Sequence, residues 1–423
     1  MTLARRPLTR FARFTWLALP CAAATVAAAS MQCGLLGPPG DYANGGAPAD
    51  EPGDASLETS SASDAMVAKD GAVVLPDGNV VPASIGTITL MAGERQPTSP
   101  EDDPAWSADA WSGILAADGH VASWRIDPSA PIVGSFDSAG LVGTTWVMIN
   151  IGFGLSGGRG TAIQTTGWSP GIVGDWKAAR ANGAPGGLDE YARVFAGAHV
   201  LYVGGVRTVV DPDGGPNTFF FTREMHIATV DPVKPELGGA TDPGQQLVDP
   251  RSRPGVLVTD GSVYVVGGRA PVSGGITSGV EQAGIDVASG ALQAFAKQPP
   301  LMNGGAEHKV FAPSVAATKG HLFVAGGRIN GASAPTDVVL SAKINADGTL
   351  GAWQSVTKLP SPLHDFAFVA FKGRLYVAGG VGASARTDEV LSATINADGT
   401  LGAWDASNAK LPAARSDFVA LAY

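Results

Sequence analysis

Six arginines recur along the chain, each a few residues after a glycine that ends an apolar segment. They are Arg95, Arg159, Arg207, Arg269, Arg328 and Arg386. A guanidinium group binds carboxylates and other anions through paired hydrogen bonds, so six arginines on one surface would form a cationic ring for an anionic ligand. In the alternative, each arginine pairs with an acid of its own or the next repeat, such as Asp337 or Asp388, and stabilises the fold.

Three other side chains have types that suit a binding or catalytic role. Trp106 lies in a long polar segment after Gly93, and its indole can either stack on a sugar ring or pack at the edge of the fold. His308 and His364 precede apolar segments, and an imidazole exchanges protons near neutral pH. A histidine without a paired base is usually not catalytic, so we identify no catalytic residue. We predict Trp106 as a ligand contact.

The chain lacks the patterns of several common chemistries. Both of its cysteines, Cys21 and Cys33, lie near the N-terminus, so we expect no thiol chemistry in the remainder. No His, Cys and carboxylate cluster has metal-ligand spacing, and the Asp-Gly pairs occur singly, as turns. No nucleophile elbow is indicated, because an elbow needs a strand that turns into a helix, and the glycine pairs end apolar segments instead of opening helices. We therefore expect no metal and no cofactor, and binding is favoured over catalysis.

The elements that position these residues are indicated by an internal repeat. Residues 337–353 (DVVLSAKINADGTLGAW) recur at 388–404 (DEVLSATINADGTLGAW), with two differences in seventeen positions. A strand-like segment ending in a glycine pair precedes each copy, at Gly326-Gly327 and at Gly379-Gly380. The period of about 51 to 53 residues is that of one blade of a β-propeller.

Weaker copies of the two markers extend upstream to residue 84. Six glycine-ended segments, such as 200–205 and 262–268, alternate with six segments that mostly end in an aromatic residue. Alternating apolar residues and tight turns suit strands joined by hairpins, and 57 Gly and 30 Pro disfavour long helices. The sequence predicts an all-β fold, a six-bladed propeller over residues 84–423. Its C-terminal strand, within 416–423, completes the first blade and closes the ring.

The repeat resembles the kelch family of β-propellers, which also includes the galactose-oxidase propeller and bacterial sialic-acid mutarotases. The resemblance covers about 340 residues and depends on the glycine pair, the trailing Trp and a Leu-Pro element such as Leu411-Pro412. The tyrosine expected between the glycine pair and the Trp is absent, and the arginine after Leu-Pro persists only as Arg415. The copper-radical chemistry of galactose oxidase uses a cysteine-linked tyrosine, for which the repeats hold no cysteine.

The N-terminal segment predicts export from the cytoplasm. Residues 1–32 contain four Arg and no acid, followed by an apolar run over 14–31, which is the pattern of an export signal. Cys33 occupies the place of the lipid-modified cysteine of a bacterial lipoprotein, and cleavage near Ala29 or an uncleaved anchor is the alternative. Residues 33–83 are rich in Gly, Pro, Ala and acids, so we interpret them as the lipid-anchor candidate and a disordered tether.

These features together predict an exported binding module of the cell envelope. Loss of residues 1–32 removes four positive charges and changes the net charge from −10 to −14, which disfavours nucleic acid as a partner. The longer connections, around 94–109 and 206–217, lie on one face, where we expect the site. The predicted function is recognition of a protein or glycan by a lipid-anchored monomer attached to the outer membrane, in the periplasm or at the cell surface. The arginines indicate an anionic partner. The alternative is a periplasmic sugar mutarotase or related carbohydrate isomerase.

Overall fold

The computed structural model describes three short strands, Met66–Val67 (β1), Val73–Val74 (β2) and Val80–Val81 (β3), and most of residues 85–423. The internal ranges outside the description are 97–106, 130–134, 143–144, 154–158, 170–171, 182–184, 210–217, 232–233, 235, 273–274, 332 and 418. The predicted export signal, Cys33 and Trp106 therefore lie outside the described residues. In β8 to β11, the side chains of many residues, Arg159 among them, are also outside the description.

The described part of the chain is all-β and is organised as successive antiparallel meanders. The first two after β7 are Ser135–Val142 (β8), Thr145–Phe153 (β9), Arg159–Ser169 (β10), Ile172–Ala181 (β11), then Ala192–Ala196 (β13), His199–Val203 (β14), Met225–Asp231 (β17) and Glu236–Leu237 (β18). The next two are Gly255–Thr259 (β19), Ser262–Val266 (β20), Val280–Gly284 (β21), Ala296–Gln298 (β22), then Ser314–Thr318 (β25), His321–Ala325 (β26), Val339–Lys343 (β29) and Gln354–Ser355 (β30). The last comprises Ala367–Phe371 (β31), Arg374–Ala378 (β32) and Val390–Thr394 (β33).

The two ends of this region share one sheet. Its order is Val419–Ala422 (β35), Gly86–Met91 (β4), Ala110–Leu115 (β6) and Val121–Asp127 (β7). Strand β35 is antiparallel to β4, with Ala420 opposite Leu90. The last residues of the chain therefore supply the first strand of the N-terminal sheet.

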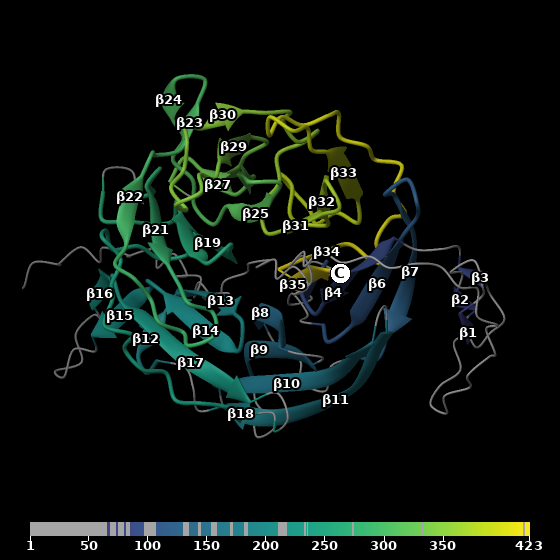
Figure 1. Ribbon diagram of the computed structural model, residues 1–423, viewed down its shortest axis with the longest axis horizontal. Coiled ribbons are helices and arrows are strands. Elements are labelled where there is room, and N and C mark those ends of the chain that lie inside the picture. The colour runs from purple at the N-terminus through teal and green to yellow at the C-terminus, as the bar shows by residue number, and fades with distance from the viewer. Residues whose placement is uncertain are drawn as a thin grey trace, which may run out of the picture.

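The first strands of successive sheets are neighbours in space. Strand β13 contacts both β8 and β19, β25 contacts both β19 and β31, and β35 contacts both β31 and β8. Figure 1 shows the sheets arranged around a common centre, with β35 and the C-terminus close to the middle. The observed architecture is that expected of a β-propeller, in which each sheet packs its two faces against its neighbours.

Burial on both faces explains the composition of the strands. All five residues of β14, HVLYV, are buried, as are all five of β20, SVYVV. A strand covered on both sides favours a nearly continuous apolar run over an alternating one. The core accordingly lies between sheets: Leu257 and Tyr264 of one sheet form a cluster with Val315 and Leu322 of the next.

Trp residues link four of the sheets to the preceding one. The indole N–H groups of Trp176, Trp353 and Trp404 donate to the carbonyl oxygens of Pro128, Pro299 and Thr357, at 2.8, 2.9 and 3.0 Å. Trp124 donates likewise to Ala409 O at 2.9 Å, which joins the first sheet to the last part of the chain. The sequence showed these aromatics only as the ends of repeated segments, and the structure adds a hydrogen bond between sheets.

The glycine pairs are required by close backbone contacts. At Gly267 (φ 61°) a Cβ atom would lie 2.6 Å from Val310 O of the next sheet, and at Gly268 (φ 102°) it would lie 2.7 Å from Ser252 O. Any side chain would clash there and would also have to adopt a left-handed φ. The glycine pair thus lets the end of β20 pass between the segment that precedes β19 and the segment that precedes β25.

Short accessory strands cover the side of the molecule where second and third strands are connected. They are Glu94–Arg95 (β5), Leu188–Asp189 (β12), Val206–Val209 (β15), Thr218–Phe221 (β16), Met302–Asn303 (β23), Ala306–Glu307 (β24), Arg328–Ile329 (β27), Ala334–Pro335 (β28) and Arg415–Ser416 (β34). Strands β12, β15 and β16 form a three-stranded sheet in that order. Within the ranges that the structure describes, no helix has the length and apolarity needed to cross a membrane.

Candidate functional site

Most of the arginines singled out from the sequence lie on this connecting side. Arg95, Arg207 and Arg328 are in the accessory strands β5, β15 and β27, and Arg269 and Arg386 are in connections. Arg159 differs, because it is the first residue of the long strand β10 instead of a loop residue. The side chains of the other five are described.

Each of these five arginines has a carboxylate partner. The pairs are Arg95 with Asp109 at 3.0 Å, Arg207 with Glu224 at 2.5 Å, Arg269 with Glu190 at 3.9 Å, Arg328 with Asp365 at 2.5 Å, and Arg386 with Glu94. Asp337 and Asp388, the partners suggested by the sequence, pair with Lys358 and Lys410 instead. The five guanidinium charges are therefore accompanied by carboxylates, and their role in binding a ligand stays a prediction.

Arg269 has the loosest pairing of the five. Its Nη1 is 3.9 Å from Glu190 Oε1, its side chain is 42% exposed, and its guanidinium lies 5.2 Å from the centre of the Phe311 ring. Stacking on the ring fixes the direction of the side chain without using its N–H donors. Arg269 is thus the described arginine whose donors are best placed for a ligand.

A backbone feature that the sequence analysis missed precedes the first strand of most sheets. One residue there has a left-handed φ although it is not glycine, in the sequence order Glu190 (51°), Arg253 (45°), Ala312 (49°), Asp365 (56°) and Asp417 (55°). The N–H groups of Arg253, Ala312 and Asp417 donate to the carbonyls of Glu190, Arg253 and Asp365 at 2.9, 3.2 and 3.0 Å. A non-glycine residue in this conformation costs on the order of 1 kcal/mol, and these bonds hold it there.

This feature has a sequence signal, visible once the repeats are aligned. The left-handed residue stands immediately before Tyr, Pro or Phe in Glu190-Tyr191, Arg253-Pro254, Ala312-Pro313, Asp365-Phe366 and Asp417-Phe418. Four of these five left-handed residues are charged. Charged side chains are therefore held directly before the first, innermost strands of the sheets.

The two histidines considered from the sequence have different environments. His364 Nδ1 is 2.6 Å from Asp365 Oδ2, the oxygen that also accepts from Arg328. His308 is largely buried, and burial lowers its pKa, so its imidazole is neutral at physiological pH. Among the described residues, no group of three or more His, Cys, Asp or Glu is arranged to hold a metal ion.

A cavity of about 340 Å³ lies beneath the hairpin of β15 and β16. Its lining residues are Asp189, Glu190, Val206, Thr208, Phe219, Phe221 and Arg269. Side chains alternate between the two faces of a strand, so Val206 and Thr208 face the cavity while Arg207 between them reaches Glu224 on the other side. On β16, Phe219 and Phe221 line the cavity in the same way, and Phe220 is not among the lining residues.

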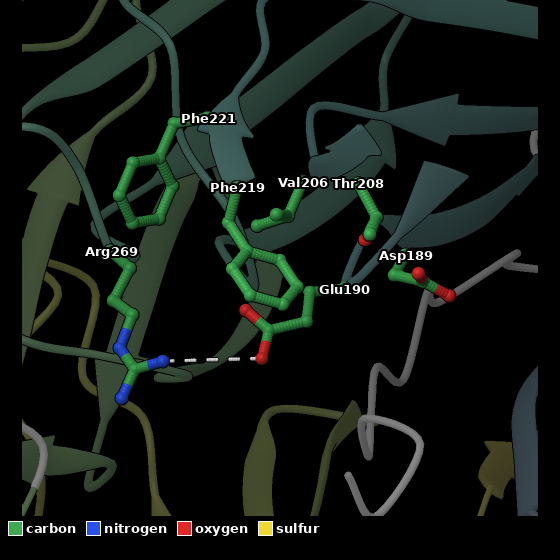
Figure 2. Close-up of a pocket in the computed structure, with 7 residues that line it drawn as sticks. All are labelled: Asp189, Glu190, Val206, Thr208, Phe219, Phe221 and Arg269. Atoms are coloured by element: carbon green, nitrogen blue, oxygen red, sulfur yellow. Dashed lines mark ion pairs between the residues drawn. The ribbon is translucent and has the colours of Figure 1, made fainter. Parts of the chain in front are cut away.

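The cavity combines an aromatic wall with polar groups of both charges. Figure 2 shows the Phe219 ring near the middle, with Arg269 and Glu190 facing each other on one side and Thr208 and Asp189 on the other. Glu190 is held by the hydroxyl of Ser252, which donates to Oε2 at 2.9 Å. Phe219 remains 65% exposed. This arrangement offers hydrogen-bond donors, acceptors and a ring face to a small polar ligand.

Sequence reasoning identified Arg269 but none of the other lining residues. The available signal was the run Thr218-Phe219-Phe220-Phe221, in which three large apolar side chains follow a long polar loop. Consecutive Phe residues on an accessory hairpin cannot all be buried in the core, so at least one must face another surface.

No protein-family model and no curated protein matches this chain. Among solved structures, the chain is similar to YjhT, a β-propeller, with a TM-score of 0.51 and 12% sequence identity over 75% of this chain and 97% of that chain. At this identity the similarity bears on architecture alone, and it agrees with the sheet arrangement described above. The chain has the β-propeller fold.

Proposed function

We propose that this protein is an exported, kelch-like propeller of six blades that acts as a glycan-binding module of the cell envelope. The proposed number of blades is supported by the five four-stranded meanders and the three-stranded one of the described region. Closure of the ring is supported by the β35–β4 pairing and by the contacts of β35 with β31 and β8. Export and attachment through Cys33 are supported by the basic and apolar N-terminal segment.

The observation that carries the binding role is the cavity beneath β15 and β16. Its volume of about 340 Å³ is near the lower end of the range for ligand pockets, roughly 300 to 1,000 Å³. Such a space suits one sugar residue and is too small for a protein element. Sugars present C–H faces that stack on aromatic rings and hydroxyls that bond to carboxylates and guanidinium groups.

The aromatic wall gives a direct test with a matched control. Phe219→Ala removes a ring that lines the cavity, whereas Phe220→Ala removes an equally large and comparably exposed ring, 54% against 65%, that does not line it. A panel of monosaccharides is titrated into the full chain and followed by ligand-observed NMR. We expect binding that is weakened about tenfold by Phe219→Ala and unchanged by Phe220→Ala.

Three results would change this assignment. Equal effects of the two Phe variants would contradict the cavity as the site. Binding of none of the sugars would leave a protein partner as the better candidate. Faster exchange between the α and β anomers of a bound sugar, abolished by Glu190→Gln, would favour the mutarotase alternative over a binding module.

A further inference from the structure

The charges around the cavity are unevenly distributed. Glu190 lies near two guanidinium groups, since its Oε1 is 3.9 Å from Arg253 Nε and 3.9 Å from Arg269 Nη1, and it accepts from Ser252. Asp189 is exposed, and within the described residues its carboxylate forms no ion pair or hydrogen bond. Two guanidinium groups face the single Glu190 carboxylate, so the negative charge of the cavity that has no basic partner among the described residues is that of Asp189.

Asp189 is held in a fixed position although its carboxylate is exposed. Its backbone pairs with Val206 in the β12–β15 ladder. The approach is so close that a Cβ atom on Gly205 would lie 2.6 Å from Asp189 O. The ladder places the carboxylate on the same side of the cavity as the Thr208 hydroxyl, as Figure 2 shows.

The surrounding groups favour a cation at this point. A carboxylate and a hydroxyl both accept hydrogen bonds from an ammonium group, and a bond between two charged partners is about twice as strong as a neutral one. The face of the Phe219 ring attracts a cation as well. The net charge of −14 beyond residue 32 adds a long-range field of the same sign.

We infer that the cavity recognises a sugar with a free amino group, with the ammonium at Asp189 and Thr208 and the hydroxyls towards Arg269 and Glu190. This assignment rests on the proposed function and narrows its ligand to cationic amino sugars. It also differs from the anionic partner that the arginines indicated in the sequence, because the arginines on this face have carboxylate partners.

The inference is tested with four related probes on the full chain. The probes are glucosamine, N-acetylglucosamine, glucose and glucuronate, titrated by NMR or calorimetry at pH 6.5. We expect glucosamine to bind about tenfold more tightly than the other three. The preference should decrease as sodium chloride is raised from 50 to 500 mM, because exposed charges are screened.

Two aspartate variants complete the test. Asp189→Asn keeps the shape of the side chain and should remove the preference for glucosamine over glucose. The matched control is Asp260→Asn, because Asp260 is also exposed but lies in the turn between β19 and β20, at the opposite ends of these strands from Gly255 and Val266. The control should leave the preference intact.

Each outcome separates the inference from the proposed function. Equal binding of glucose and glucosamine, lost in Phe219→Ala, would overturn the amino-sugar assignment and leave a glycan site in place. Tighter binding of glucuronate, or a glucosamine preference that survives Asp189→Asn, would also overturn it. Binding of none of the four probes would overturn both the inference and the proposed sugar site.

Discussion

His120 Nε2 lies 2.5 Å from Asp405 Oδ2, although the two residues are separated by most of the chain. The other ring nitrogen, Nδ1, is 3.1 Å from Asp118 Oδ2. The Arg374 side chain packs against Gly119, the residue between Asp118 and His120 in the sequence. An imidazole that bonds two carboxylates must carry both protons. The junction between the first sheet and the last thus includes a titratable contact.

This contact should make stability depend on pH. The hydrogen bond to Asp405 and the proximity of Asp118 raise the pKa of His120. The stabilisation is therefore fully present below the unfolded pKa of about 6.5 and is lost as the pH rises through the higher folded pKa. We expect His120→Gln to lower Tm by about 2 °C at pH 5.5 and to have no effect at pH 9, in a series of thermal melts. A difference that is the same at both pH values would contradict this role.

The arginine pairs should differ in their effects on binding and stability. Arg328→Ala leaves Asp365, which is 5% exposed, without its guanidinium partner, and should reduce the free energy of unfolding by about 1 to 3 kcal/mol. Arg269→Ala breaks an ion pair of 3.9 Å and a stack on the Phe311 ring, both of a half-exposed side chain, and should change stability less than Arg328→Ala but weaken sugar binding. Urea titration and ligand titration of both variants check this prediction. A larger loss of stability in Arg269→Ala, or a larger loss of sugar binding in Arg328→Ala, would contradict it.

The Trp hydrogen bonds should contribute to stability according to their burial. Trp353→Phe keeps most of the ring but removes the donor to Pro299 O in a partly buried site, and should cost about 1 to 2 kcal/mol. Trp404→Phe removes the equivalent bond to Thr357 O at an exposed site and should cost less. The midpoints of urea unfolding give both values. A larger loss in Trp404→Phe would show that the bond to the preceding sheet is not the relevant contact.

Removal of residues 416–423 should destabilise the whole domain. It exposes the edge of β4 and deletes the buried residues Val419, Ala420 and Leu421. Unfolding should shift to much lower urea and the protein should aggregate, because an open apolar edge pairs with other chains. Deletion of residues 272–275 serves as the control, and an unchanged midpoint in the C-terminal truncation would rule out the proposed closure.

The anchor proposal depends on one side chain. Cys33→Ser should abolish incorporation of a labelled fatty acid and move the protein from the membrane fraction to the soluble fraction. Cys21→Ser is the matched control, because Cys21 lies within the predicted signal. If Cys33→Ser stays with the membrane, lipid attachment at this position is wrong.

The β-propeller fold was accessible from the sequence because its determinants are local and repeated. The glycine pair at Gly267-Gly268 marks the end of a strand and excludes any side chain, and the structure explains both glycines by contacts with neighbouring loops. Trp353 and Trp404 recur because each makes the same bond to the preceding sheet. A six-bladed, closed ring remains the proposed arrangement.

The site was less accessible because it depends on contacts between residues far apart in sequence. The partner of Arg269 is Glu190, and that of Arg386 is Glu94, and no local pattern predicts either pair. The cavity lies beneath the β15–β16 hairpin, whose four-residue strands are longer than the two-residue strands β27 and β28 at the equivalent place in another repeat, so the period gives no information about it. Trp106 and Cys33 lie outside the described residues and stay predictions.

The position of β35 also determines when the protein can fold. Strand β4 is among the first parts of the domain to be synthesised, and its partner β35 is the last. Until residue 422 has emerged, β4 therefore keeps one edge without its native neighbour, and the N-terminal sheet lacks its innermost strand. Completion of the domain must follow synthesis of β35, so a ribosome or export channel that still holds Val419–Ala422 also holds the domain in an unfinished state.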